Sequence, residues 1–413
     1  MVSGKAGEQV TPQKPSIVLG ITADMSLKLM EGFPQYLARR GWDVHVVCSP
    51  GPLLDELKQE PGVTTHPIAM ARRPAPIADL TALARWVFLL QRLRPDITSV
   101  GTPKAGFLGG IAGMVTRVPA RIYMLRGLHF ETATGLKFKL LMILEKVSLA
   151  TAHSALAVSP SLRSRAIGLG LVRAEKIVVL GAGSSNGVDL LHYKPRRTDH
   201  PECEDGNKLA IELGLAPDVP VIGFVGRLSE DKGLADLAKA RDILHSRGLD
   251  HQLLVVGGID DSAAPAVLKE LERSGRPPIQ TGYVRDTAPY YRLMDLLCLP
   301  TRREGFPNVV LEASATAVPT VTTDATGAID SVVDGETGVI ARMDSVAELA
   351  DGLALLIQNP GLRQRMGIAS RQRAQDHYRR PLIWNLLEEF YTQSLPHQGP
   401  GQDSGAVTLS EAR

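Results

Sequence analysis

The chain has 413 residues, more than one ordinary core organises, so two domains are expected. With 44% hydrophobic and 22% charged residues, its composition is that of a soluble globular protein. The net charge of +2 hides an asymmetry: residues 1–200 carry 25 Lys and Arg against 14 Asp and Glu, and residues 201–413 carry 21 against 30. The first half is therefore expected to face an anionic ligand or surface, unless the asymmetry is only uneven solvated charge.

Cysteine spacing and hydropathy exclude several classes of protein. Cys48, Cys203 and Cys298 are far apart and form no C-x-x-C pair, so neither a zinc site nor a disulfide framework is indicated. A reducing cytoplasm fits this usage best. Residues 1–15 are polar and lack the apolar region of a secretion signal. No apolar stretch approaches the roughly 20 residues that span a bilayer, so contact with a membrane would be peripheral.

Short apolar runs alternate with helical segments along the first half of the chain. Strands are expected at 16–21, 42–48, 96–101, 121–125, 154–159 and 176–180, and helices at 30–41, 79–95 and 104–118. This alternation implies βαβ units and a parallel sheet.

A Gly- and Pro-rich segment at 181–197 predicts the connection to a second domain, where the same rhythm restarts. Strands are expected there at 221–226, 251–258, 296–301 and 319–324, and helices at 235–248, 268–275, 309–319 and 346–358. We therefore predict two doubly wound α/β units. The predicted division is a flexible start (1–15), a Rossmann-like domain (16–190), a second Rossmann-like domain (191–379), a C-terminal helix returning to the first domain (380–396) and a disordered tail (397–413).

The strongest functional signal is residues 303–315, REGFPNVVLEASA. Glu304 precedes a turn at 305–307, and that turn opens the helix expected to carry Glu312. Ligands of open α/β sheets bind beyond the carboxyl ends of strands, where free amides at a helix N-terminus suit a phosphate. The first carboxylate could accept hydrogen bonds from sugar hydroxyls, and the second from a ribose diol. Taken alone, two surface carboxylates near a helix start are the commoner explanation.

A second signal is residues 224–237, where a strand ends at Gly226 and Arg227 and Lys232 flank a short loop before a helix. Arg can grip two oxygens of a diphosphate, while Lys acts as a point charge. Solvated loop charges are the alternative explanation for this segment alone.

Together the two segments resemble the retaining GT-B glycosyltransferases of the large group 1 family, which also holds bacterial lipopolysaccharide and capsule transferases. The more specific likeness lies in residues 223–233 (GFVGRLSEDKG), 282–286 (GYVRD), 304–313 (EGFPNVVLEA) and 337–350 (TGVIARMDSVAELA). A weaker likeness lies in residues 102–113, 126–132 and 183–195, so the resemblance covers about 16–395. It implies a GT-B fold of two Rossmann-like domains with a cleft between them, the first binding the acceptor and the second the nucleotide-sugar donor.

The resemblance also implies roles for individual residues. Arg227 and Lys232 would neutralise the donor diphosphate and stabilise it as a leaving group. Glu304 would contact the transferred sugar, and Glu312 the ribose. The other donor-binding positions would be Val284 at the base and Gly305, Phe306, Pro307, Asn308 and Val309 along sugar and phosphate.

The chain departs from the family at Arg126-Gly127, where many relatives have His-Gly, and His129 follows two residues after that glycine. Arg126 cannot act as a base at neutral pH but could bind phosphate, so we place it in the acceptor site. His129 is either a structural residue or the replacement for the family's active-site histidine. The expected catalytic residues are Glu304, Arg227, Lys232 and His129.

Two motifs are missing and one is incomplete. No D-x-D occurs, so neither a metal nor any cofactor besides the donor is expected, and no P-loop is present. Nothing suggests a nucleic-acid partner. Residues 183–187 match G-x-S-x-G, but the segment that follows is broken by Pro195 and does not predict the helix of a hydrolase elbow.

Residues 136–150 predict a partly amphipathic helix in which Lys137, Lys139 and Lys146 lie among large apolar residues. Such a helix can lie on an anionic membrane, although an ordinary helix packed on the first sheet is the alternative. With the charge asymmetry, it predicts a cytoplasmic protein whose first domain contacts the membrane peripherally.

We therefore expect a retaining glycosyltransferase that moves a sugar from a UDP-sugar to a glycan or lipid-linked acceptor in cell-surface polysaccharide or glycolipid biosynthesis. The preference for uridine rests on the resemblance alone. The alternatives are a UDP-sugar epimerase on the same fold, which needs no acceptor, and a non-enzymatic nucleotide-sugar binding protein.

Overall fold

The computed structural model describes residues 14–71, 75–196, 208–260, 264–272 and 275–396. The expected disordered tail, Cys203 and nearly all of the expected flexible start lie outside these residues. Within them, no helix is long and apolar enough to cross a bilayer, and the two described cysteines, Cys48 and Cys298, are buried free thiols.

The strands are β1 (Ser16–Gly20), β2 (Asp43–Cys48), β3 (Val63–Pro67), β4 (Ile97–Gly101), β5 (Ala120–Leu125), β6 (Ser154–Ala157), β7 (Ile177–Val178), β8 (Val221–Val225), β9 (Gln252–Val256), β10 (Ile279–Gly282), β11 (Leu296–Leu299), β12 (Thr320–Thr323) and β13 (Gly338–Ala341).

The α-helices are α1 (Phe33–Arg39), α2 (Pro52–Leu57), α3 (Pro76–Leu93), α4 (Pro103–Val115), α5 (Gly135–Thr151), α6 (Pro160–Gly168), α8 (Leu234–Ser246), α9 (Ala264–Leu271), α10 (Ala288–Tyr291), α11 (Asn308–Ala315), α12 (Val346–Gln358), α13 (Pro360–His377) and α14 (Arg380–Gln393). The 3-10 helices are η1 (Asp24–Met30), η2 (Ala174–Lys176), η3 (Glu230–Lys232) and η4 (Ile329–Ser331).

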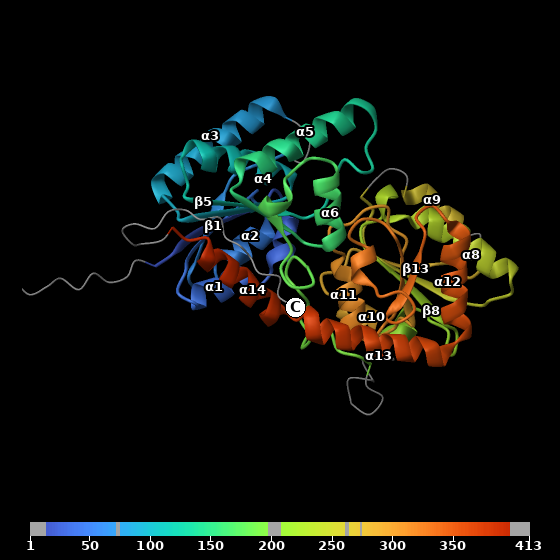
Figure 1. The fold of residues 1–413 in the computed structure, drawn as a ribbon. Helices are drawn as coiled ribbons and strands as arrows, with labels where there is room; N and C mark the ends of the chain where they lie inside the picture. The colour runs from blue at the N-terminus through green and yellow to red at the C-terminus, as the bar shows by residue number, and fades with distance from the viewer. Residues whose placement is uncertain (1–13, 72–74, 197–207, 261–263, 273–274, 397–413) are drawn as a thin grey trace, which may run out of the picture.

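The strands form two parallel sheets, one in each half of the chain (Figure 1). The first has the order β3-β2-β1-β4-β5-β6-β7, and the second has the order β10-β9-β8-β11-β12-β13. In each sheet the order reverses direction beside the first strand of that half, as in doubly wound Rossmann-like units. Strands such as β8 and β9 are buried along their whole length because helices cover both faces of a parallel sheet. The expected α/β class is therefore confirmed.

Helices α3, α4 and α5 cover one face of the first sheet, and α1 and α14 cover the other (Figure 1). Helix α4 packs between α3 and α5 and lies close to the sheet. Its glycines permit this approach: a Cβ atom at Gly106 would overlap the ring of Tyr123, and one at Gly110 would overlap Thr151. The small-residue composition of α4 therefore follows from its buried central position.

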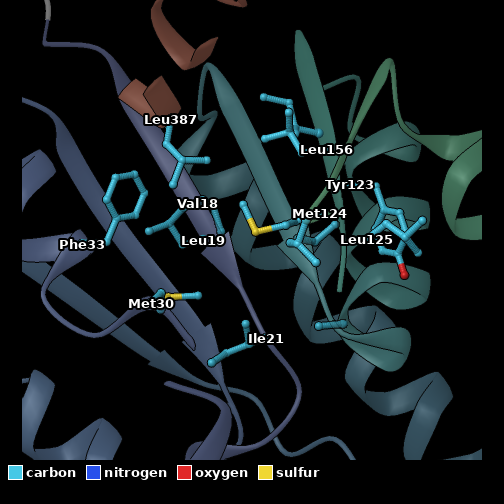
Figure 2. Packing of buried hydrophobic residues seen from close by; sticks show 14 of the residues in the cluster. Val18, Leu19, Ile21, Met30, Phe33, Tyr123, Met124, Leu125, Leu156 and Leu387 are labelled. Carbon is cyan, nitrogen blue, oxygen red and sulfur yellow. The ribbon is translucent and has the colours of Figure 1, made fainter. Parts of the chain in front are cut away.

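The apolar core of the first domain includes the last helix of the chain. In Figure 2, Leu387 of α14 lies over Val18 and Leu19 of β1, with Phe33 of α1 beside them. A hydrogen bond of 2.8 Å joins the hydroxyls of Ser99 on β4 and Tyr391 on α14. Helix α14 therefore packs on the first sheet although α13, which precedes it, packs against α11 of the second domain.

The chain crosses between the domains twice, and the two crossings lie side by side. The backbone N–H of Val188 donates to the carbonyl of Tyr378 at 2.7 Å, and that of Arg380 donates to the carbonyl of Val188 at 3.1 Å. Gly187 has a φ of 66°, and a Cβ atom there would overlap the carbonyl oxygen of Tyr378. Glycine is therefore required for the two segments to approach this closely.

Several elements differ from the sequence-based expectation. Strands β3, β10 and β13 were not anticipated because they are short edge strands, and β3 and β10 also lack an apolar run. Helix α13 was missed because its sequence is largely polar and only a narrow stripe is buried. The helix expected at 30–41 is interrupted by Gly32, whose φ of 78° separates η1 from α1. The helix expected at 268–275 begins earlier, at Ala264.

Candidate functional site

The loops after β8, β9 and β11 pack together at the carboxyl ends of the second sheet. The N–H of Gly226 donates to the carbonyl of Val256 at 3.0 Å. A Cβ atom at Gly257 would overlap the carbonyl oxygen of Gly226, and one at Gly233 would overlap that of Pro300. Both glycines have positive φ, 148° and 73°, which few other residues adopt. These close approaches bring the segment containing Arg227 and Lys232 beside the segment that follows β11.

Lys232 and Glu304 meet as an ion pair, although they are 72 residues apart in sequence. The Nζ atom of Lys232 lies 2.5 Å from Oε1 of Glu304, and the two side chains are only 16% and 12% exposed. The backbone N–H of Glu304 donates to the carbonyl of Thr326 at 2.9 Å, which fixes the main chain at this point. Because water has limited access, the charges interact more strongly than an exposed pair. The two strongest sequence signals therefore form one site.

Two further guanidinium groups belong to the same region. Arg227 pairs with Asp260 and is about half exposed. Arg303 pairs with Asp231 at 2.7 Å, and its side chain is 16% exposed. Although burial opposes it, a hydrogen bond from Ser229 and the charges of Arg303 and Lys232 hold the pKa of Asp231 below its usual value. Sequence analysis passed over Arg303, even though it directly precedes Glu304.

The turn that opens α11 presents its main chain rather than its side chains. Gly305, Phe306 and Pro307 are buried, and the ring of Phe306 packs on Tyr378 with centroids 5.2 Å apart. Pro307 is the N-cap of α11, and no side chain caps this helix. Its first amides are therefore available to an anion. The buried Oδ1 atom of Asn308 has no hydrogen-bond partner among the described residues.

The remaining expected donor-binding residues gather on the other side of α11. Glu312 accepts hydrogen bonds from the hydroxyls of Tyr291 at 2.9 Å and Thr287 at 3.4 Å. Burial raises the pKa of Glu312 to about 7, although these hydrogen bonds oppose the shift. Val284, on the loop between β10 and α10, and Val309 pack against the same apolar cluster of the second domain. Glu312 therefore titrates near neutral pH beside the loop expected to hold the base.

The first domain touches the site through the loop between β5 and α5. A Cβ atom at Gly305 would overlap the carbonyl oxygen of Arg126, and a Cβ atom at Gly127 would lie 3.4 Å from the backbone nitrogen of Gly305. Farther along the same loop, Thr132 accepts a hydrogen bond from Nε of Arg303 at 3.2 Å. The candidate site therefore lies where the two domains meet.

His129, on this loop, faces the cations of the second domain. His129 is exposed to solvent, although protein lies close to part of its ring. This partial burial, followed by the charges of Arg303 and Arg227, lowers the pKa of His129 to about 4. The ring is therefore neutral at physiological pH and can exchange hydrogen bonds without carrying charge.

Arg126 lies deeper in the first domain, beneath η1. Its Nη1 atom donates to the carbonyl of Leu29 at 3.2 Å, while its Nε atom is buried without a partner among the described residues. Burial lowers the pKa of Arg126 to about 10, so it stays protonated at neutral pH. It lines a small pocket with Ser99, Ser185 and Tyr391. The structure thus separates Arg126 from the cations that surround His129.

The chemistry of the site is that of anion binding beside hydroxyl recognition. Arg227, Lys232 and Arg303 supply positive charge, and Glu304 and Glu312 supply acceptors for hydroxyl groups. Within the described residues, no group of three or more His, Cys, Asp or Glu side chains is placed to hold a metal ion. These side chains fit a ligand that carries both phosphate and sugar.

Comparisons with known proteins agree with this chemistry. The model described as "Glycosyl transferase 4-like domain" matches residues 33–183, and "Glycosyl transferases group 1" matches residues 219–359. The chain is 37% identical over 377 residues to the capsular polysaccharide biosynthesis glycosyltransferase CapM of Staphylococcus aureus, covering 91% of this chain and 96% of CapM.

Solved structures show the same fold. The Anabaena protein Alr3699/HepE in complex with UDP has a TM-score of 0.72 at 20% identity, covering 92% of this chain and 100% of that chain. Sucrose-phosphate synthase of Thermosynechococcus elongatus has a TM-score of 0.76 at 18% identity, covering 92% and 99%. Both likenesses confirm the expected GT-B fold of two Rossmann-like domains.

Proposed function

Because this chain belongs to the group 1 glycosyltransferase family and is therefore a glycosyltransferase, we propose that it transfers a sugar from a UDP-sugar, with retention, to a glycan or lipid-linked acceptor in capsular polysaccharide biosynthesis. The observation that carries this proposal is the Lys232–Glu304 pair at the domain junction, with Arg227 beside it. The capsular assignment is supported by the likeness to CapM along almost the whole chain. The choice of UDP is supported by the UDP complexes of structures that share the fold.

In this proposal the reaction breaks the bond between the anomeric carbon of the sugar and the β-phosphate oxygen, and the electron pair leaves with UDP. Arg227 and Lys232 stabilise the negative charge that develops on the diphosphate. The acceptor hydroxyl attacks from the face that the diphosphate leaves, and its proton passes to the departing phosphate oxygen. Glu304 positions the sugar through its hydroxyls, so no nucleophile from the protein is required.

We further propose that the transferase needs no divalent metal, since Arg227, Lys232 and Arg303 can supply the positive charge that a metal supplies elsewhere. Turnover in the presence of EDTA should equal turnover without it. Loss of activity with EDTA that manganese or magnesium restores would contradict this part of the proposal.

The proposed site of action is the cytoplasmic face of the membrane. A lipid-linked acceptor places the reaction there, and nucleotide sugars are cytoplasmic. The basic first half of the chain fits peripheral contact with anionic lipids.

The test is a panel of UDP-sugars incubated with and without lipid-diphosphate acceptors, followed by NMR of the anomeric configuration. We expect UDP release that depends on acceptor, and a product with the configuration of the donor. An epimerised sugar formed without acceptor would indicate the epimerase alternative. Binding of UDP-sugar with neither outcome would indicate a binding protein, and an inverted product would overturn retention.

A further inference from the structure

One face of the first domain exposes a cluster of large apolar side chains. They lie on α3 and α5 and at the end of α4: Ile77, Leu80, Phe88, Met114, Val115, Leu136, Leu140 and Ile143. Ile77 and Leu136 are 87% and 84% exposed. Figure 1 shows the three helices together on one side of the first sheet, and α4 packs between the other two. We call this surface the α3–α5 face.

The exposed apolar residues of α5 follow a helical repeat of their own. Leu136, Leu140 and Ile143 are spaced i, i+4 and i+7, which places them on one side of the helix. A different side of α5, containing Ser148 and Leu149, is buried against the domain. Helix α5 therefore has a second apolar stripe that nothing in the described residues covers.

Helix α3 repeats the arrangement. Ile77, Leu80 and Phe88 are exposed at i, i+3 and i+11, whereas Trp86 and Leu90 are fully buried on another side. Helices α3 and α5, on either side of α4, thus both carry exposed apolar stripes in the layer that covers one side of the sheet. Large apolar side chains that are exposed on packed helices of one layer are a feature of interaction surfaces.

The charges around these stripes are almost all positive. The exposed cations of the two helices are Arg85, Arg92, Lys137, Lys139 and Lys146. The three helices contain only two carboxylates. Asp79 is paired with Lys104 at 2.7 Å, and Glu145 is buried and accepts a hydrogen bond from Tyr123 at 2.7 Å. The face therefore combines exposed apolar side chains with exposed cations, while its two carboxylates are paired or buried.

This face is also connected to the reaction site. Helix α5 begins at Gly135, directly after the loop that carries His129 and Thr132. Thr132 accepts the hydrogen bond from Arg303, so the exposed Leu136 lies only four residues from a contact of the donor site. A surface seated on the α3–α5 face would bring its bound molecules to the domain junction.

We propose that the α3–α5 face docks the transferase on a bilayer containing anionic lipids, with Leu136, Leu140 and Ile143 inserted among the headgroups. Apolar side chains lose water by insertion, and lysines beside them reach the anionic headgroups. A second copy of the chain fits this surface less well, since pairing two such faces would oppose their cations. Docking itself is independent of the donor, and only the delivery of a lipid-linked acceptor rests on the proposed function.

The test is flotation of the full-length protein with phosphatidylcholine vesicles that contain or lack phosphatidylglycerol. We expect binding that rises with phosphatidylglycerol and falls with salt. Replacement of Leu136, Leu140 and Ile143 by Ser should weaken partitioning at least about tenfold. Replacement of Lys137, Lys139 and Lys146 by Gln should weaken it about fivefold for each lysine at low salt.

The matched control replaces three exposed apolar residues of other surfaces, Leu191, Ile211 and Ile368, by Ser. It should bind vesicles like the wild type. Circular dichroism and calorimetric UDP binding show whether each variant keeps its fold and donor site. Equal binding by the α5 variant and the wild type would overturn the proposal. So would an α5 variant that turns a dimer into a monomer without losing vesicle binding.

Vesicle binding and transfer are separable outcomes. If the wild type binds anionic vesicles but transfers no sugar from any UDP-sugar, the docking proposal stands and the proposed function is refuted. A wild type that glycosylates a soluble acceptor but ignores anionic vesicles would refute the docking surface alone.

Discussion

The two domains share a strand order, yet their corresponding helix N-termini differ in what occupies them. In the first domain, the hydroxyl of Thr22 accepts a hydrogen bond from the amide of Ala105 at the start of α4 and bonds Thr102 at 2.8 Å. In the second domain, α11 begins after its N-cap, Pro307, without any side-chain cap. The same topology therefore gives one helix N-terminus whose amide is bonded by the protein itself and one whose amides are left open for an anion. Fold alone does not locate a site, because the side chains at the strand ends decide which half binds phosphate.

Each domain also contains a hydrogen-bonded pair of a tyrosine and a glutamate. The hydroxyl of Tyr123 donates to Glu145 at 2.7 Å in the first domain, and that of Tyr291 donates to Glu312 at 2.9 Å in the second. Burial raises the pKa of both carboxyls to about 7. Glu145 lies between α5 and the first sheet, whereas Glu312 lies beside the loop expected to hold the nucleotide base. The same pair lies beneath a helix in one half, and in our proposal it meets the ribose in the other.

The largest effect is expected at the Lys232–Glu304 ion pair of the second domain. Glu304→Gln should lower transfer by about a hundredfold or more, because in our proposal the carboxylate positions the sugar in the transition state. Asp79→Asn is the matched control, since it breaks the similarly covered pair with Lys104 in the first domain. Transfer measured with a soluble acceptor should stay near the wild-type rate in that control. Comparable losses in both variants would show that Glu304 acts only through stability.

Substitution of the cations in the donor site of the second domain should affect the binding of UDP more than that of uridine. Arg227→Ala and Lys232→Ala should each weaken UDP binding about ten- to a hundredfold, since a charge-assisted hydrogen bond contributes roughly 1.5–3 kcal/mol. Uridine, which lacks the diphosphate, should bind almost unchanged in calorimetry. Arg40→Ala is the control in the first domain, where Arg40 pairs with Glu388 and is exposed to a similar degree. Equal losses for both ligands would rule out a diphosphate role.

The two Tyr–Glu pairs predict different pH responses. Uridine affinity should rise about tenfold between pH 6 and 8, because a ribose diol donates to ionised Glu312, whose pKa is about 7. Glu312→Gln should remove this dependence, and Glu145→Gln should keep it. Using uridine avoids the titration of phosphate. A flat wild-type curve would place the ribose elsewhere.

Both glutamates should also make the fold sensitive to pH, with a defined sign. Their pKa values are raised in the folded protein, so the folded state binds more protons and stability falls as pH rises from about 4.5 to about 7. Thermal melting over this range should show a smaller decline in either Gln variant than in the wild type. If the decline of the melting temperature with pH is the same in both variants as in the wild type, other groups cause it.

The smallest effect is expected at His129. Its pKa of about 4 leaves the ring neutral above pH 5, so it supplies hydrogen bonds rather than a proton. His129→Asn should reduce turnover by about tenfold or less and leave the shape of the pH–rate profile between pH 5.5 and 7 unchanged. Disappearance of an acidic limb in this variant would show that His129 titrates during catalysis.

The sequence was sufficient for the parts of the fold that repeat locally. Buried strands such as β8 are apolar runs, and the neighbourhood of Lys232 and Glu304 follows from the rule that carboxyl ends of parallel strands meet at one edge. Edge strand β3 has no apolar run, and only its pairing with β2 defines it. Such long-range partners are not encoded in a short window.

The same limit applies to the site. Neither the Arg303–Asp231 pair nor the contact of Thr132 with Arg303 could be inferred from spacing, because these residues come from separate loops and, for Thr132, from the other domain. The separation of Arg126 from the cations near His129 has the same origin, although the two residues are only three positions apart. Local sequence therefore identifies candidate residues, whereas the docking of the domains decides which of them meet.

The position of α14 has a consequence for how the chain is made. Helix α1, whose Tyr36 hydroxyl donates to Glu388 at 2.7 Å, leaves the ribosome well before α14, which completes the same layer. At roughly 5–20 residues per second, the interval between these two helices is on the order of tens of seconds. Throughout that time the surface around Phe33 and Ser99 has no cover from α14, while the whole second domain is being synthesised. The domain whose synthesis begins first is thus the one that finishes folding last. While α14 is missing, its uncovered sheet is the surface that a chaperone would bind most readily.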